Sequence, residues 1–131
     1  ILQDTVREHS PDTIVLARYM QIIPPAMCRE HQHKIINIHH SFLPSFVGAD
    51  PYQRAYDRGV KLIGATCHYV TDELDEGPII EQDVVRVGHQ YDKSAMVRLG
   101  KDVETAVLAK GLRYHLEDRC MVYGNKTVIF E

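Results

Sequence analysis

The sequence lacks the features that mark disulfide-rich, nucleic-acid-binding and membrane-spanning proteins. It contains three cysteines in 131 residues, and no two of them form a Cys-x-x-Cys pair. An odd number of scattered cysteines argues against a disulfide framework and is typical of reduced thiols. The formal net charge is −3 and no basic cluster is present, so the chain has no electrostatic footprint for nucleic acid or an anionic membrane surface.

Long apolar runs, a signal peptide and metal-ligand spacings are also missing. No apolar run approaches the roughly 20 residues that cross a bilayer. His31 and His33 lie two positions apart, but no cysteine or carboxylate stands at metal-ligand spacing beside them. We therefore expect a cytoplasmic protein with no metal site, no membrane contact and no nucleic-acid partner.

The patterns that are present predict a single α/β domain. A chain of 131 residues with 44% hydrophobic and 25% charged residues is long enough to bury one core. The continuous apolar run at 13–17 is typical of a strand buried on both faces of a parallel sheet. We predict an open, mostly parallel twisted sheet with flanking helices. We expect strands at 61–70 and 79–87, helices at 26–30, 51–58 and from Asp92 to about 115, and a C-terminal hairpin at 121–130 that turns at Gly124 and Asn125.

The candidate site begins with the run Asn37-Ile38-His39-His40. Side chains two positions apart on a strand share a face, so Asn37 and His39 point one way and His40 the other. The Asn37 amide can donate to a developing oxyanion, and the His39 imidazole can donate or accept a proton. Taken alone, this pattern is also that of an ordinary polar strand end.

A second stretch, His-Tyr-Val-Thr-Asp-Glu-Leu-Asp-Glu-Gly-Pro at 68–78, adds to this pattern. Together with Asn37-Ile-His39 and Ser-Phe-Leu-Pro at 41–44, it resembles the catalytic half of the formyltransferase family that uses 10-formyltetrahydrofolate. Within that family the chain is most similar to the formyltetrahydrofolate deformylases, through 59–70, 76–84 and 122–128 and through His40, where transferases usually carry proline. The similarity covers about 12–131.

The resemblance implies both the site and its chemistry. The reactive residues would be Asn37, His39 and Asp75. The substrate would contact Met20, Gln21, Ile22 and Ile23 after the first strand, and Val70, Thr71 and Asp72 after a later one; His40, His68 and Gly48 would support the site. His68 is open to a second interpretation as a satisfied core histidine. No cofactor or metal is implied beyond the folate substrate.

The implied reaction is hydrolysis of 10-formyltetrahydrofolate to tetrahydrofolate and formate. Two alternatives stay open: formyl transfer to an amine, such as glycinamide ribonucleotide, a sugar amine or Met-tRNA, and a non-catalytic folate-binding fragment. Residues 1–131 would be the C-terminal part of the catalytic domain, without an N-terminal ACT-type module and the first βαβ units. In the family fold other strands pair with 13–17, so we expect an open apolar edge there and a homo-oligomer.

Overall fold

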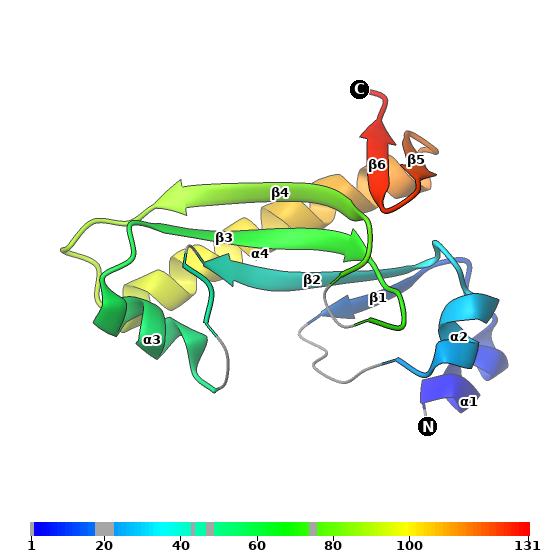
Figure 1. Cartoon of the computed structure of the whole chain (residues 1–131), viewed down its shortest axis with the longest axis horizontal. Coiled ribbons are helices and arrows are strands. Elements are labelled where there is room, and N and C mark those ends of the chain that lie inside the picture. Colours follow the sequence, from blue (N-terminus) through cyan, green and yellow to red (C-terminus); the bar gives the residue numbers. More distant parts are fainter. Residues whose placement is uncertain (1, 18–22, 43, 47–48, 74–75) are drawn as a thin grey trace.

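The computed structural model describes residues 2–17, 23–42, 44–46, 49–73 and 76–131 (Figure 1). In chain order the elements are α1 (Leu2–His9), β1 (Ile14–Ala17), α2 (Pro25–Glu30), β2 (Ile35–Phe42), α3 (Pro51–Arg58), β3 (Leu62–Tyr69), β4 (Ile79–Arg86), α4 (Lys93–Leu116), β5 (Cys120–Tyr123) and β6 (Lys126–Ile129).

Four strands form one sheet in the order β1-β2-β3-β4, and β5 and β6 form a separate hairpin. The α/β class, the flanking helices and the hairpin are confirmed. The sheet is mixed, however, and the expected majority of parallel pairs is not found among the described strands. β1 and β2 run parallel, whereas β2–β3 and β3–β4 are antiparallel.

The connections explain the antiparallel pairs. A parallel crossover needs about a dozen residues or more, and residues 70–78 between β3 and β4 are too few. Between β2 and β3, helix α3 stays at one end of the sheet instead of crossing a face (Figure 1). The chain therefore re-enters the sheet from the end at which it left.

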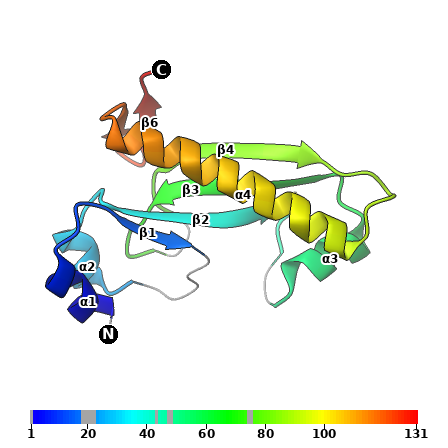
Figure 2. The same cartoon turned by 180° about the vertical axis from the view of Figure 1, so that it is seen from behind.

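Helix α4 lies diagonally across one face of the sheet (Figure 2). Its Val107 and Tyr114 share a buried cluster with Ile36, Ile38 and Cys67 of the strands. Gly111 permits this close approach, because a Cβ there would lie 2.7 Å from the Cys67 Sγ atom. A second cluster joins α1 and α2 to β1 and the start of β2.

The predicted helix boundaries are confirmed by their capping groups. Asp50 has a left-handed backbone (φ 50°) and accepts a hydrogen bond from the Gln53 N–H at 3.3 Å, and α3 ends at Gly59 with φ 72°. Asp92 caps α4 by accepting from the Ala95 N–H at 2.8 Å. None of the helices in the described ranges is both long and apolar enough to cross a membrane.

Candidate active site

The sheet face turned away from α4 carries the candidate site. Asn37 and His39 of β2 lie opposite His68 and Thr66 of β3, respectively, in the antiparallel register. The His39 and His68 rings are 5.2 Å apart and meet edge to face at 66°. The strand alternation thus gathers one amide and two imidazoles on a single face, as the sequence pattern predicts for these residues.

Backbone carbonyls determine which ring nitrogen of each histidine carries a proton. His39 Nδ1 donates to the His40 carbonyl oxygen at 2.9 Å, and His68 Nδ1 donates to the Tyr69 carbonyl oxygen at 2.8 Å. A carbonyl oxygen only accepts, so the proton resides on Nδ1 in both neutral rings. Nε2 is therefore the unprotonated nitrogen of the neutral His39 ring, and it is the atom of this ring that can accept a proton.

Asn37 lies deeper than His39. Its side chain is 6% exposed, and its Oδ1 atom is buried with no hydrogen-bond partner among the described residues. Leaving a buried polar atom unsatisfied costs about 1–3 kcal/mol, and proteins that retain such an atom usually have a functional reason. A buried amide oxygen without a protein partner fits a group whose partner is a bound ligand.

A pocket of about 470 Å³ opens beside His39, and we call it the His39 pocket. Its polar floor is organised around Thr66: the Thr66 Oγ1 atom accepts from Gln82 Nε2 at 2.9 Å and lies 2.7 Å from Ser41 Oγ. The pocket is lined by His39, Thr66, Glu76, Gly77, Ile79, Gln82, Asn125, Lys126 and Thr127.

A second pocket of about 340 Å³ brings together Val70, Thr71 and Asp72. Its opposite wall is formed by α2 and the residues after it, including Cys28 and Arg29. Burial raises the pKa of the Cys28 thiol, and the nearby Asp72 charge raises it further. Ile23 is 3% exposed and packs in the cluster of α1 and α2, so it lies in the core of the molecule.

Asp75, Met20, Gln21, Ile22 and Gly48 lie outside the described residues, so their predicted roles stay predictions. The two ends of the acidic turn are nonetheless placed. The Tyr69 N–H donates to the Pro78 carbonyl oxygen at 2.9 Å, and Gly77 approaches the Tyr69 carbonyl so closely that a Cβ would overlap it. The turn therefore returns to the sheet directly beside His68.

His40 faces away from Asn37 and His39. Its ring packs against Phe42 and Tyr52, with centroid distances of 5.3 and 5.6 Å. It therefore belongs to an aromatic group between β2 and α3, on the α4 side of the sheet.

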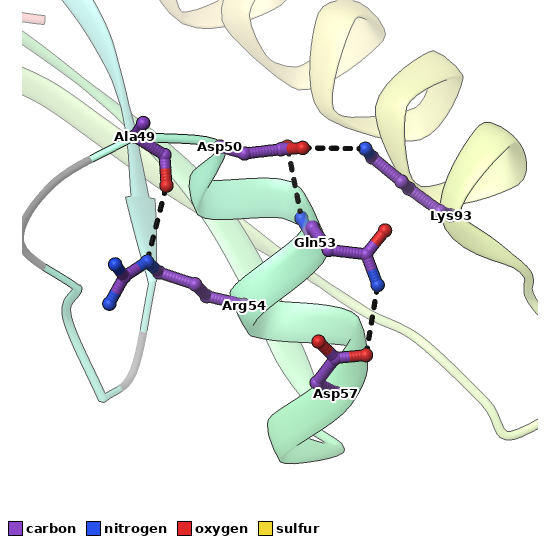
Figure 3. A network of polar contacts seen from close by, with 6 residues as sticks. All are labelled: Ala49, Asp50, Gln53, Arg54, Asp57 and Lys93. Atoms are coloured by element: carbon purple, nitrogen blue, oxygen red, sulfur yellow. Dashed lines mark hydrogen bonds and ion pairs between the residues drawn. The ribbon is translucent and has the colours of Figure 1, made fainter.

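The segment before α3 is held by the polar contacts drawn in Figure 3. Lys93 of α4 forms an ion pair with Asp50 at 2.8 Å, and Arg54 Nε donates to the Ala49 carbonyl oxygen at 3.1 Å. The Lys93 hydrogen bond is the main reason that the pKa of the Asp50 carboxyl group is lowered. These contacts join the start of α3 to the first turn of α4.

Sequence reasoning missed the contribution of Gln82 and of the hairpin to the His39 pocket. Gln82 reaches Thr66 across the β3–β4 pair, and Lys126 arrives from a hairpin far along the chain. The face shared by Thr66 and His68 could be predicted from strand alternation, but the cross-strand register could not.

The chain was compared with known families and proteins. The family described as Formyl transferase matches residues 1–112. The formyltetrahydrofolate deformylase of Bacillus subtilis (strain 168) is 57% identical over 127 residues, which are 97% of this chain and 42% of that protein. The deformylase of Mycobacterium tuberculosis (strain H37Rv) is 60% identical over 119 residues, 91% of this chain and 38% of that protein.

Solved structures give the same result. A formyltetrahydrofolate deformylase from Pseudomonas syringae pv. tomato superimposes with a TM-score of 0.90 at 67% identity, covering 99% of this chain and 44% of that one. A phosphoribosylglycinamide formyltransferase from Anaplasma phagocytophilum superimposes with a TM-score of 0.86 at 35% identity, covering 99% of this chain and 64% of that one. The chain spans less than half the length of the deformylases that it matches. This chain belongs to the formyl transferase family.

Proposed function

We propose that the protein containing this chain hydrolyses 10-formyltetrahydrofolate to tetrahydrofolate and formate, as a deformylase of one-carbon metabolism. The observation that carries the proposal is the shared face of Asn37, His39 and His68 beside a polar pocket. The comparisons support the hydrolase over the transferase, because matched deformylase structures are 43–67% identical and matched glycinamide ribonucleotide formyltransferases 30–36%.

Asn37 is assigned to the oxyanion that forms when water adds to the formyl carbon. Its side-chain NH2 group donates to that oxygen from a buried position, where a hydrogen bond to developing charge is stronger than in water. His39 assists once its Nε2 atom is protonated, because Nδ1 is already engaged with a backbone carbonyl. Asp75 is assigned to orient the attacking water.

In the proposed steps, protons pass only between the attacking water, the Asp75–His39 pair and N10 of the folate. The water gives up a proton to the Asp75–His39 pair as its oxygen bonds to the formyl carbon. The tetrahedral intermediate then collapses, the bond between carbon and N10 breaks, and the proton passes to N10. Such proton transfers contribute roughly 10²–10⁴ in rate. A carboxylate and an imidazole that interact closely lose their protons as a coupled pair, so under this proposal a pH–rate profile would report on the pair.

Folate binding is assigned to the two segments that the resemblance selects. Val70, Thr71 and Asp72 line one pocket with α2, next to the turn that contains Asp75. Met20, Gln21 and Ile22 are proposed as further folate contacts, whereas Ile23 is buried in the core. The folate would then approach from the α2 side, while the His39 pocket lies on the other side of residues 76–78.

The decisive experiment uses a full-length protein, meaning one of the relatives' length that contains this chain. It is incubated with 10-formyltetrahydrofolate and no amine, and formate is measured with a coupled dehydrogenase. Formate release supports hydrolysis. Turnover that begins only after an amine is added identifies a transferase, and folate binding without either reaction identifies a non-catalytic binding protein.

Asp75→Asn tests the proposed role of the carboxylate. We expect formate release to be abolished and folate affinity, measured by calorimetry, to stay nearly unchanged, because the amide cannot accept a proton but retains the shape of the acid. Asp102→Asn, which removes the same charge from an exposed position on α4, serves as the control and should turn over normally. Comparable turnover by both variants would remove Asp75 from the mechanism.

A further inference from the structure

The His39 pocket has a buried floor and an exposed rim. Thr66 is 5% exposed and Gly77 is also buried, whereas Glu76, Gln82 and Lys126 are exposed. His39 is half-buried between the two zones. The pocket therefore leads from solvent to the imidazole without passing through the folate-side pocket lined by 70–72.

The floor is suited to water. Thr66 Oγ1 accepts from Gln82, so its own hydroxyl proton can be donated to Ser41 Oγ at 2.7 Å. Such hydroxyl and amide groups are the partners that ordered water uses. With about 30 Å³ of liquid volume for each molecule, a pocket of 470 Å³ holds on the order of ten waters. Hydrolysis consumes one of them at each turnover.

The rim carries one positive charge. Lys126 is the only lysine or arginine lining this pocket, and it makes no ion pair with any residue in the described ranges. Glu76 lies on the same rim and carries the opposite charge. A small anion that leaves past His39 would therefore meet one cation and one repelling carboxylate, which favours binding that is brief and weak.

The hairpin holds Lys126 at this place. The Thr127 hydroxyl donates to the Ile79 carbonyl oxygen at 2.5 Å, which ties β6 to the first residue of β4. Figure 1 shows β6 standing beside the start of β4, at the end of the sheet where β3 finishes. Asn125 lines both pockets, so the hairpin turn lies near residues 70–72 and 76–79.

We propose that the His39 pocket admits the reacting water and releases the formate product, and that Lys126 binds the carboxylate of formate at the rim. This inference rests on the proposed deformylase function. It adds a product site and a residue, Lys126, that takes no part in the chemical step. The ligand class is a small monocarboxylate, and the folate glutamate carboxylate is the competing source of the same chemistry.

The test compares Lys126→Gln with Lys61→Gln in the full-length protein. Both lysines are exposed, and Lys61 precedes β3 at the opposite end of that strand. Product inhibition is measured by adding sodium formate to the deformylase assay at constant ionic strength. We expect Lys126→Gln to raise the formate inhibition constant by about twofold to fivefold, as for other exposed ionic contacts, and Lys61→Gln to leave it unchanged. In about 0.5 M NaCl, the difference between the formate inhibition constants of the two variants should vanish.

Three outcomes overturn the proposal. Equal formate inhibition constants for the two variants exclude Lys126 as a formate ligand. If Lys126→Gln raises the KM for the folate substrate and leaves the formate inhibition constant unchanged, Lys126 binds the glutamate carboxylate of the folate and not formate. If enlarging the exposed Ile79 to tryptophan, which narrows the pocket, leaves kcat unaltered, the pocket is not the route for water and product. Absence of formate release by the unmodified protein would instead refute the proposed function itself.

Discussion

Under the proposed function, Asn37 supplies the oxyanion donor from a buried position. Asn37→Ala should lower the turnover of 10-formyltetrahydrofolate by about 10²–10³, the usual cost of losing one oxyanion donor. The melting temperature should change little, because the Asn37 Oδ1 atom makes no hydrogen bond to any of the described residues that the substitution would break. The two measurements are steady-state formate release and thermal unfolding. A large loss of stability with little loss of rate would make Asn37 a structural residue.

His115 gives a prediction about acid sensitivity. Its Nδ1 lies 2.8 Å from the Tyr69 hydroxyl and its Nε2 lies 3.1 Å from Thr13 Oγ1. Burial lowers the pKa of the His115 imidazole, partly offset by the charge of Asp118. In the unfolded chain the pKa is about 6.5, so on acidification the unfolded state takes up the proton first. The free energy of unfolding contributed by neutral His115 is therefore complete above about pH 6.5 and falls as the pH drops through the lowered folded value.

Thermal unfolding between about pH 7.5 and 5.5 measures this effect. His115→Gln retains an amide for the two hydroxyl groups but cannot titrate, so its melting temperature should fall less on acidification than that of the unmodified protein. His89→Gln, at an exposed position, is the matched control. Parallel pH dependence in the unmodified protein and His115→Gln would show that the partly buried His115 imidazole is not the acid-sensitive group.

For individual residues, the sequence predicted which side chains share a face of the sheet but not which groups surround them. Strand alternation correctly separates Asn37 and His39 from His40, and it places His68 with Thr66. The backbone carbonyls that fix both histidine tautomers follow from local conformation, which no sequence pattern encodes. The predicted catalytic role of Asp75 depends on the family resemblance alone, because four carboxylates in six residues are otherwise typical of a solvated turn.

Among the elements, α4 depends on one glycine for its contact with the sheet. Alanine is normally the better helix former by about 1 kcal/mol. At Gly111, however, a Cβ would lie 2.7 Å from the Sγ atom of Cys67, which is fully buried. Gly111→Ala should therefore lower the free energy of unfolding by about 1–3 kcal/mol, the usual cost of overpacking.

A double-mutant cycle of Gly111→Ala with Cys67→Ala, measured by urea unfolding, tests whether the contact with Cys67 causes the loss of stability. Removing the Sγ atom leaves the Cys67 Cβ at 3.3 Å and the Ile80 Cγ2 at 3.6 Å from the added methyl group, so most of the loss should be recovered. Burial raises the pKa of the Cys67 thiol to about 12, so the sulfur is uncharged at neutral pH and the cycle measures packing. If the two substitutions change the free energy of unfolding additively, the Gly111–Cys67 contact is not the cause of the loss.

Element boundaries were predictable because the capping residues are local signals. Asp50, Gly59 and Asp92 each lie where the sequence places a helix end. The strand directions were not predictable in the same way. A helix between two strands suggests a parallel crossover, and only the position of α3 at the end of the sheet shows that β3 runs back along β2.

For the molecule as a whole, the two pockets meet at residues 76–79. Residues 76–78 separate the pocket lined by 70–72 from the His39 pocket, and the hairpin borders both. Under the proposed function, the folate would use the pocket lined by 70–72 and the attacking water would use the His39 pocket. That arrangement suits hydrolysis, in which the second reactant is small and needs no binding site of its own.

The exposed edge of the sheet gives the last prediction. β1 pairs only with β2 among the described strands, and Val15 on it is 40% exposed. An unpaired strand edge with an apolar side chain is a template for pairing with another chain. We therefore expect the 131-residue chain on its own to self-associate as its concentration rises, which sedimentation velocity would detect. Val15→Lys should shift it toward monomer, whereas Val128→Lys, at a 42% exposed position on the hairpin, should not. A monodisperse monomer with a cooperative melt would show that the edge is protected within the chain itself.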